Sequence, residues 1–564
     1  MNNPRVLLWL ALAAILLLNY QAWMKDYGAT PAASPAATST ASHNPSASAD
    51  AAVPQTFATE TGTPVAGAPA PAATSSASAI VEHGTGNAPH VHVRTDVLDM
   101  DISLQGGTIT RADLLHYPRV KGSAEPVRLM NQDSALSWYV LNSGIAGPGT
   151  AHPTQAAEFT APASQYDLGS AAQLLVPLTW TDGRGVSVTK TFTFHRGDYR
   201  IDLQYAVDNR SSEPWQGAVY GQIQRYDVPV ARSYFNVEGN ASHGPAVGDG
   251  TKYRFLSVDK PENHSLDIQA RGGWIAAVQL YFVGAVVPEA ALQNRITLSI
   301  EERKFQLTVT GPLRTIAPDT TGTFKETLFV GPKLQAQLSA LAPYLDRVAD
   351  YGTFTLIALP LFWVLGKVHG FFGNWGVAII LTTFLLKLLF YPLSEASGRS
   401  MAKMKTLSPR IKNLQDMYKD DKEKLGRAMM ELYKREKVNP VAGCLPIIIQ
   451  IPVFLAFYWV LLESVEMRQA PFAGWIHDLS ARDPAFILPA IMAAAMLVQY
   501  KLNPTPPDPV QAKVFLFMPL IMSATFAFFP AGLVLYWVTN TLLSIAQQWN
   551  INRRISAAAA KRTD

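Results

Sequence analysis

The chain has 564 residues, of which 48% are hydrophobic and only 16% are charged, and its formal net charge is +4. It is too long for one compact core and too apolar for an ordinary soluble protein. The basic residues cluster beside apolar stretches, which favours a membrane protein and argues against sequence-specific nucleic-acid binding. The single cysteine, Cys444, rules out an intrachain disulfide, and we expect it to be a small buried residue.

The N-terminal 27 residues are expected to form a membrane anchor. Val6 to Leu18 is continuously apolar and follows Arg5. Bulky Tyr20 and Trp23 follow the apolar run, which favours an uncleaved anchor over a cleaved signal peptide. Residues 28–80 are rich in Ala, Pro, Ser and Thr and predict a disordered linker.

Residues 81–332 have the pattern of a strand-rich domain. Apolar residues alternate from Leu98 to Leu104 before a Gly106-Gly107 turn, and two hairpins follow at 192–207 and 296–309. These patterns predict a large antiparallel β-sandwich outside the membrane.

Residues 333–370 are expected to form an amphipathic, interfacial helical region. Leu334 to Val348 has helical spacing and is predicted to be one helix, with the membrane surface as a possible location. Phe354 to Val368 is apolar but short and contains Pro360 and Gly366. It is either an interfacial helix or part of a tilted first span.

A polytopic helical region of five spans is predicted from 371 to 552. The five apolar segments are Phe371–Tyr391, Val441–Leu461, Phe486–Tyr500, Val514–Phe529 and Gly532–Gln548. With the anchor they make six. The basic loop 393–440 and the basic tail 553–564 predict that both termini are cytoplasmic and that the strand-rich domain lies on the other side.

The loop 393–440 is itself predicted to be a helical hairpin. An apolar face recurs from Leu425 to Tyr433, and Asp420 with Glu423 resembles a capping box at the start of the second helix. Its methionines are either adaptable contact surfaces or ordinary packing residues. The residues selected for partner contact are Arg399, Lys403, Met404, Lys405, Met429 and Met430.

Polar residues inside the predicted spans mark the candidate site. Lys387 lies among apolar residues, where a cation is costly unless it faces water or a partner. It either lines a hydrated groove or extends to the lipid headgroups. Thr383 lies four residues before it, on the same helical face. The last span carries a polar stripe at helical spacing, made of Tyr536, Asn540, Ser544 and Gln547, and Gln450 adds an amide within the third span. They either line the same groove or make only hydrogen bonds between helices.

Enzymatic chemistry has no support in the sequence. No nucleophile with a base, metal-ligand cluster or phosphate-binding glycine loop is evident, and His477-Asp478 is too weak a signal for a catalytic pair. We therefore expect no cofactor, no metal and no covalent catalysis.

Long motifs between Asn374 and Gln548 resemble the common core of the YidC, Oxa and Alb insertase family. They are SMAKMKTLSPRIKNL from Ser400, ELYKREKVNPVAGCLPIIIQIPVF from Glu431, RQAPFAGWIHDLSARDP from Arg468 and FPAGLVLYWVTN from Phe529. By position and strand pattern, the strand-rich domain resembles the periplasmic domain of the Gram-negative members, a sandwich similar to sugar mutarotases.

The resemblance implies an insertase and chaperone for integral membrane proteins in the bacterial inner membrane. It places Lys387 at the basic position of the groove, often Arg in relatives, and Thr383 with Tyr536-Trp537 at groove or substrate-contact positions. Trp537 stands where Tyr is common. Implied partners are nascent membrane proteins, the Sec translocon, translating ribosomes and membrane lipids. The competing interpretations are a solute transporter or channel using the same polar groove, and a sugar enzyme housed in the sandwich.

Overall fold

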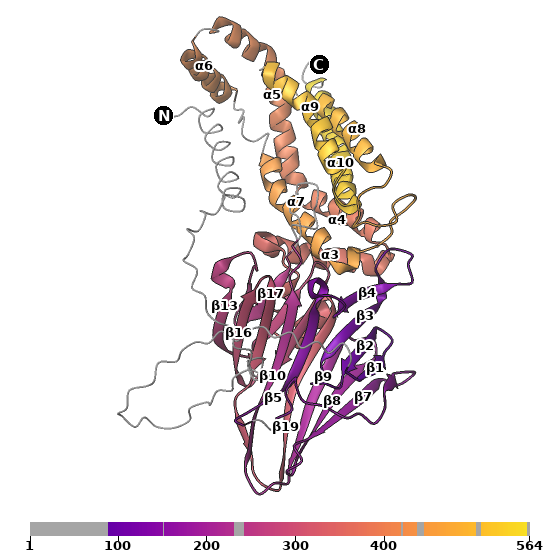
Figure 1. The fold of residues 1–564 in the computed structure, drawn as a ribbon. Coiled ribbons are helices and arrows are strands. Elements are labelled where there is room, and N and C mark those ends of the chain that lie inside the picture. The colour runs from indigo at the N-terminus through magenta and orange to yellow at the C-terminus, as the bar shows by residue number, and fades with distance from the viewer. Residues whose placement is uncertain are drawn as a thin grey trace, which may run out of the picture.

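The computed structural model describes residues 88–149, 152–229, 242–418, 421–436, 445–502 and 509–560. Figure 1 shows a β-sandwich at one end of the molecule and a group of helices at the other. The predicted anchor, the predicted linker, Cys444 and the last four residues lie outside the described residues.

The sandwich consists of two sheets. The first has eleven strands and the second has eight. The path of the first sheet is β13 (Ser265–Arg271), β16 (Gln293–Glu301), β17 (Lys304–Thr310), β10 (Trp215–Tyr226), β5 (Tyr139–Ala146), β3 (Ile109–Pro118), β2 (Leu98–Ser103), β1 (His90–Arg94) and β6 (Gln165–Asp167), with β18 (Arg314–Ile316) on β10 and β4 (Pro126–Met130) on β3. The path of the second is β12 (Tyr253–Phe255), β11 (Gly244–Gly248), β14 (Trp274–Val278), β15 (Phe282–Pro288), β19 (Thr320–Pro332), β9 (Arg200–Asn209), β8 (Val186–His195) and β7 (Gln173–Thr181).

The predicted sandwich and both predicted hairpins are confirmed. Phe194 in β8 is paired with Ile201 in β9, and Ile300 in β16 with Phe305 in β17. The Gly106-Gly107 turn has φ angles of 72° and 60°, which side chains disfavour. One pairing departs from the antiparallel prediction, because β1 and β6 run parallel.

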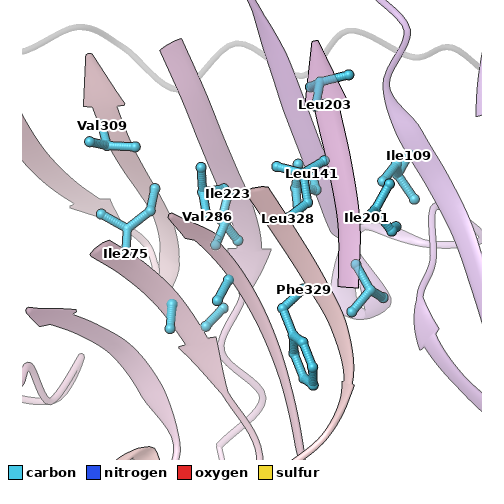
Figure 2. Packing of buried hydrophobic residues seen from close by; sticks show 14 of the residues in the cluster. Ile109, Leu141, Ile201, Leu203, Ile223, Ile275, Val286, Val309, Leu328 and Phe329 are labelled. Atoms are coloured by element: carbon cyan, nitrogen blue, oxygen red, sulfur yellow. The ribbon is translucent and has the colours of Figure 1, made fainter. Parts of the chain in front are cut away.

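Alternate residues of the two sheets meet in one hydrophobic core. In Figure 2, Ile109, Leu141, Ile223 and Val309 come from the first sheet, while Ile201, Leu203 and Leu328 come from the second. These side chains are buried because successive residues of a strand face opposite sides of the sheet. This core gives the sandwich its own stability.

The connector after the sandwich differs from the single helix predicted for Leu334–Val348. Helix α2 (Gln335–Leu341) ends before Pro343, Tyr344 has a φ of 64°, and a short 3-10 helix η5 (Leu345–Val348) follows. Proline cannot continue the hydrogen-bond pattern of the helix, which explains the break. Leu338 and Leu345 are buried in the core cluster of the sandwich, so the predicted apolar face packs on protein.

Helix α3 (Thr355–Phe372) follows the short 3-10 helix η6 (Gly352–Phe354) and is separate from the next helix. Gly373 has a φ of 67°, and the Asn374 side chain caps the following helix by accepting a hydrogen bond from the Val377 amide. The imidazole of His369 stacks on Trp375 across this break, with ring centroids 3.9 Å apart. The segment predicted as interfacial or part of the first span is therefore a helix of its own.

The five predicted span segments contain helices. They are α4 (Trp375–Leu389), α7 (Leu445–Glu463), α8 (Ile487–Leu502), α9 (Pro509–Phe526) and α10 (Ala531–Ala560). In the described part of the chain, Gly352–Phe372 is long and apolar enough to cross a membrane, and α4 with the start of α5 would be a second such segment bent by 62°. Segments Ile448–Glu463, Ile487–Leu502 and Lys513–Phe526 are apolar but shorter.

The loop predicted as a helical hairpin contains α5 (Tyr391–Met417) and α6 (Lys422–Arg435). Leu407 and Ile411 of α5 pack against Met429, Leu432 and Tyr433 of α6. The N-cap of α6 is Asp421, which accepts a hydrogen bond from the Lys424 amide at 3.0 Å, so the predicted cap at Asp420 is wrong by one residue. Figure 1 shows this hairpin at the end of the molecule opposite the sandwich.

Candidate functional site

A cleft lies between α4, α5, α7 and α10, and the empty space in and around it, open solvent included, is about 450 Å³. Its lining consists of six polar and five apolar residues. The polar residues that sequence analysis selected are Thr383, Lys387, Gln450, Tyr536 and Asn540, and the residues that it missed are Leu386, Phe390, Leu393, Ser394, Ile449 and Val453. Polar groups therefore meet on one wall of an otherwise apolar cavity.

Among the described residues, Lys387 is the one cation that lines this cleft, and it is half-buried near the end of α4. Its Nζ donates a hydrogen bond to Ser544 Oγ at 2.8 Å, and Ser544 Oγ donates in turn to the Asn540 carbonyl at 2.7 Å. Among the residues that the structure describes, no carboxylate forms an ion pair with Lys387. The cation thus retains donor capacity for a group that enters the cleft.

The stripe on α10 explains why these residues meet. Tyr536, Asn540 and Ser544 are four residues apart, so they lie on one face of the helix. The matching pair on α4, Thr383 and Lys387, has the same spacing. The α4 and α10 helices pack directly against each other, which brings the two faces together.

Neutral polar groups complete the wall. Thr383 is 1% exposed, and its hydroxyl donates to the Ile379 carbonyl at 2.7 Å within α4. Gln450 lies on α7 and interacts with the hydroxyl of Tyr536. The ring of Tyr536 stacks on Phe457 with centroids 4.5 Å apart, so packing fixes the direction of its hydroxyl.

Trp537 does not line the cleft, although the sequence grouped it with Tyr536. Its ring packs edge-on against Phe454 at 4.8 Å and against Phe526 at 5.1 Å. Adjacent residues of a helix point about 100° apart, which explains why the two aromatic residues face different neighbours. Ser544 is also outside the lining, and it contributes through its bond to Lys387.

The residues selected on the hairpin lie in different local environments. Arg399 pairs with Glu395 at 2.5 Å, and Met429 packs in the hairpin's own apolar cluster. Lys403 is exposed, Met404 is half-buried and Met430 is 44% exposed. The side chain of Lys405 lies outside the described residues.

The cleft is far from the sandwich. It is lined by Ile449, Gln450 and Val453 near the start of α7 and by Leu393 and Ser394 at the start of α5. The other end of α7, at Glu463, contacts the sandwich connector. The cleft therefore lies in the half of the helical bundle next to the α5–α6 hairpin.

Comparison with known proteins covers both parts of the chain. Residues 367–558 match the family model described as 60Kd inner membrane protein, and residues 90–364 match the model of the YidC periplasmic domain. The chain is 43% identical to a membrane protein insertase YidC from Thioalkalivibrio sulfidiphilus over 581 aligned positions, covering 100% of both chains. It is 43% identical to another from Cupriavidus necator, covering 99% of both.

A similar solved structure is described as an active YidC insertase with the first transmembrane domain resolved. It is 18% identical, covers 81% of this chain and 92% of that chain, and has a TM-score of 0.36.

Proposed function

The chain belongs to the YidC family of membrane protein insertases, and from this premise we propose that client proteins enter the bilayer by way of the cleft around Lys387. The protein is a membrane protein insertase with a periplasmic-type β-sandwich and a helical insertase region. A solute channel is not favoured, because relatives matching its full length are insertases.

The cost of moving polar groups explains why a cleft promotes insertion. A client must carry a hydrophilic tail across hydrocarbon, where unpaired polar groups cost several kcal/mol each. The amide of Gln450, the amide of Asn540 and the hydroxyl of Tyr536 face a space that can hydrate such a tail. A shorter path through hydrocarbon lowers the barrier without fuel.

Lys387 supplies the electrostatic part of this mechanism. Its ammonium faces the cleft without an ionic partner among the described residues, so it attracts acidic or polar segments of the tail. Exposed apolar residues guide the client helix, including Ile448 and Ile451 on α7 and Phe517 and Ile521 on α9. Partition of the client helix into lipid supplies the driving force.

The division and orientation of the chain belong to the same proposal. Its parts are an anchor (1–27), a linker (28–80), the sandwich (81–332), an interfacial region (333–370), the insertase core (371–552) and a basic tail (553–564). Basic residues of the 393–440 hairpin and tail favour the cytoplasm. The sandwich then lies in the periplasm, with six spans in the inner membrane.

Partners follow from this arrangement. Nascent membrane proteins are the clients, and we include the Sec translocon and the translating ribosome as partners. Arg399, Lys403, Lys405, Met404, Met429 and Met430 of the hairpin are the proposed contact residues, supported by exposure of Lys403 and Met430. No cofactor enters the mechanism.

The observation that carries the proposal is a lysine inside an otherwise apolar helical cleft. The test is insertion of a two-span client into liposomes that contain only the purified protein, measured by protease protection. The variants are Lys387→Ala and a matched control, Lys367→Ala, which removes an exposed lysine that lies over the Trp363 ring on α3.

We expect protection with the wild type and the control, and a several-fold loss with Lys387→Ala. Equal protection with all three proteins would overturn the role of the cleft. Protection no better than in empty liposomes would overturn autonomous insertion by this chain.

A further inference from the structure

A fully buried ion pair joins the sandwich connector to the membrane helices. Lys333 Nζ lies 2.6 Å from Glu463 Oε2, and both side chains are 0% exposed. Lys333 directly follows β19, and Glu463 is the last residue of α7. The two residues are 130 positions apart, so this contact depends on how the two parts of the molecule are assembled.

Each partner is also held by the backbone around it. The Lys333 amide donates to the Tyr281 carbonyl at 2.9 Å, which ties its backbone to the second sheet. Glu463 Oε1 accepts a hydrogen bond from the Ser242 amide at 3.1 Å, so a segment of the sandwich contacts the carboxylate directly. The carboxylate of a membrane helix is therefore bound by the sandwich and its connector together.

The chain beyond Glu463 takes part in both hydrophobic cores. Val465, which is 1% exposed, belongs to the core cluster of the sandwich. Met467, two residues later in the 3-10 helix η8 (Val465–Met467), belongs to the core cluster of the helices. An apolar contact of this kind fixes position as well as contributing stability, because protein interiors are close-packed.

A second set of contacts joins the sandwich to the segment that follows η8. The guanidinium of Arg468 donates to the Pro118 carbonyl at 2.8 Å and lies 5.6 Å from the centre of the Phe282 ring. Lys121, on the turn between β3 and β4, donates to the Gln469 carbonyl at 2.8 Å. The sandwich thus holds the outer end of α7 at several points.

We propose that Lys333 and Glu463 are positioning residues that set the placement of α7, and through it the cleft wall that carries Gln450 and Val453. Gln450 is thirteen residues before Glu463 in the same helix, about 20 Å at the usual rise of 1.5 Å per residue. This inference rests on the proposed role of the cleft. It gives the periplasmic sandwich a mechanical part in insertion.

The ionic character of the contact makes a specific energetic prediction. Removing one member of a buried pair leaves an uncompensated charge, whereas replacing both with apolar residues of similar size removes that penalty. The double variant Lys333→Met with Glu463→Met should therefore disturb the protein less than the two single variants combined.

Hydrogen exchange on the full-length protein in lipid nanodiscs tests the proposal without relying on activity. Lys333→Met and Glu463→Met should each raise amide exchange at least tenfold in 463–470 and also in the cleft-lining part of α7, at 449–455. In the double variant, amide exchange in both regions should fall most of the way back to the wild-type rate. The matched control is Arg295→Met, which removes an equally short ion pair, Arg295 to Asp267 at 2.6 Å, on the sandwich surface.

Insertion of the two-span client is then measured with the same variants. We expect a several-fold loss for each single variant, recovery in the double variant and no change for the control. Faster exchange confined to 463–470 would mean that the pair is only a local structural contact, and it would overturn the proposal. Unchanged exchange in both 463–470 and 449–455 would also overturn it.

The two proposals fail in different ways. If Lys387→Ala does not affect insertion, the proposed role of the cleft is wrong, whatever the exchange data show. If Lys387→Ala reduces insertion but the single variants at Lys333 and Glu463 do not, the cleft stands and the positioning role is overturned.

Discussion

Lys387 Nζ donates a 2.8 Å hydrogen bond to Ser544 Oγ, which joins α4 to α10 beside the cleft. The partner is neutral, so the hydrogen bond orients the ammonium without cancelling its charge. This combination suits a transient contact with an acidic tail, because a carboxylate partner from the protein itself would compete with the client.

Charge reversal at this position should discriminate between clients. We expect Lys387→Glu to slow insertion of a client with an acidic tail by about tenfold, and insertion of a neutral-tailed client by about twofold, because the same site then repels the tail. Paired clients that differ only in tail charge provide the measurement. Equal slowing of both clients would remove the electrostatic part of the mechanism.

Ser544→Ala separates the orientation of the ammonium from its charge. Loss of one hydrogen bond from a charged group costs roughly 1.5–3 kcal/mol at most, and the lysine remains charged. We therefore expect a smaller loss of insertion than with Lys387→Ala, measured in the same liposomes. A larger loss would mean that Ser544 itself contacts the client.

Trp537→Tyr should act on stability more than on the cleft. The Trp537 ring packs against Phe454 and Phe526 and does not line the cavity, so a smaller ring leaves a packing defect of about 1–3 kcal/mol. Thermal unfolding in detergent should show the loss, with insertion per folded molecule unchanged. Higher insertion by the variant would assign the tyrosine hydroxyl a direct role.

The sandwich should show a pH dependence that arises from Glu326 on β19. Burial raises the pKa of Glu326 to about 8 from an ordinary value of 4.5. The folded state therefore keeps a proton that the unfolded chain releases, so this group's contribution to stability is complete below pH 4.5 and declines as pH rises towards 8. Burial also lowers the pKa of Lys190 to about 7, and its effect has the opposite sign above that pH.

We expect Glu326→Gln to flatten the decline in urea stability between pH 5 and pH 6, which lies below the folded-state pKa of about 7 of Lys190. The matched control is Glu289→Gln, since Glu289 is exposed. Unfolding followed by near-UV circular dichroism at each pH is the measurement. A pH slope equal to that of the wild type would show that Glu326 is already ionised in the folded sandwich.

Lys190 itself should be a strong determinant of stability. Its Nζ donates to the carbonyl oxygens of Gly106, Gly107 and Ser143 at 2.8–3.0 Å, which ties β8 of the second sheet to the first sheet. Lys190→Met leaves these carbonyls without that donor and should destabilise the sandwich by about 3 kcal/mol or more. A loss below about 1 kcal/mol in urea unfolding would contradict this role.

Periodic patterns in the sequence predicted the local elements well. The strands flanking Gly197-Asp198 follow from alternation alone, and the stripe from Tyr536 to Ser544 follows from helical spacing. The proximity of this stripe to Lys387 was only a hypothesis, because periodicity gives the face of a helix but not the neighbour that it meets. The alternative, that these polar residues make only hydrogen bonds between helices, stays open, because Lys387 and Ser544 form such a bond.

Other features leave no local trace in the sequence. The Lys333 and Glu463 pair joins positions 130 residues apart, and neither residue differs locally from an ordinary surface charge. The break before Tyr344 was missed because hydrophobic spacing continues through Pro343 from Leu341 to Leu345. The apolar residues that line the cleft, such as Phe390 and Val453, cannot be told from lipid-facing residues by their sequence, because only the fold shows what they face.

The placement of Val465 in the sandwich core has a consequence for how the protein itself is made. The sandwich precedes α7 in the chain, so ribosomes synthesise all of its strands first. Its hydrophobic core nevertheless lacks the Val465 side chain until residue 465 has been synthesised. The core of the sandwich can therefore be completed only after α7 has been synthesised, so folding of this domain ends later than synthesis of its last strand.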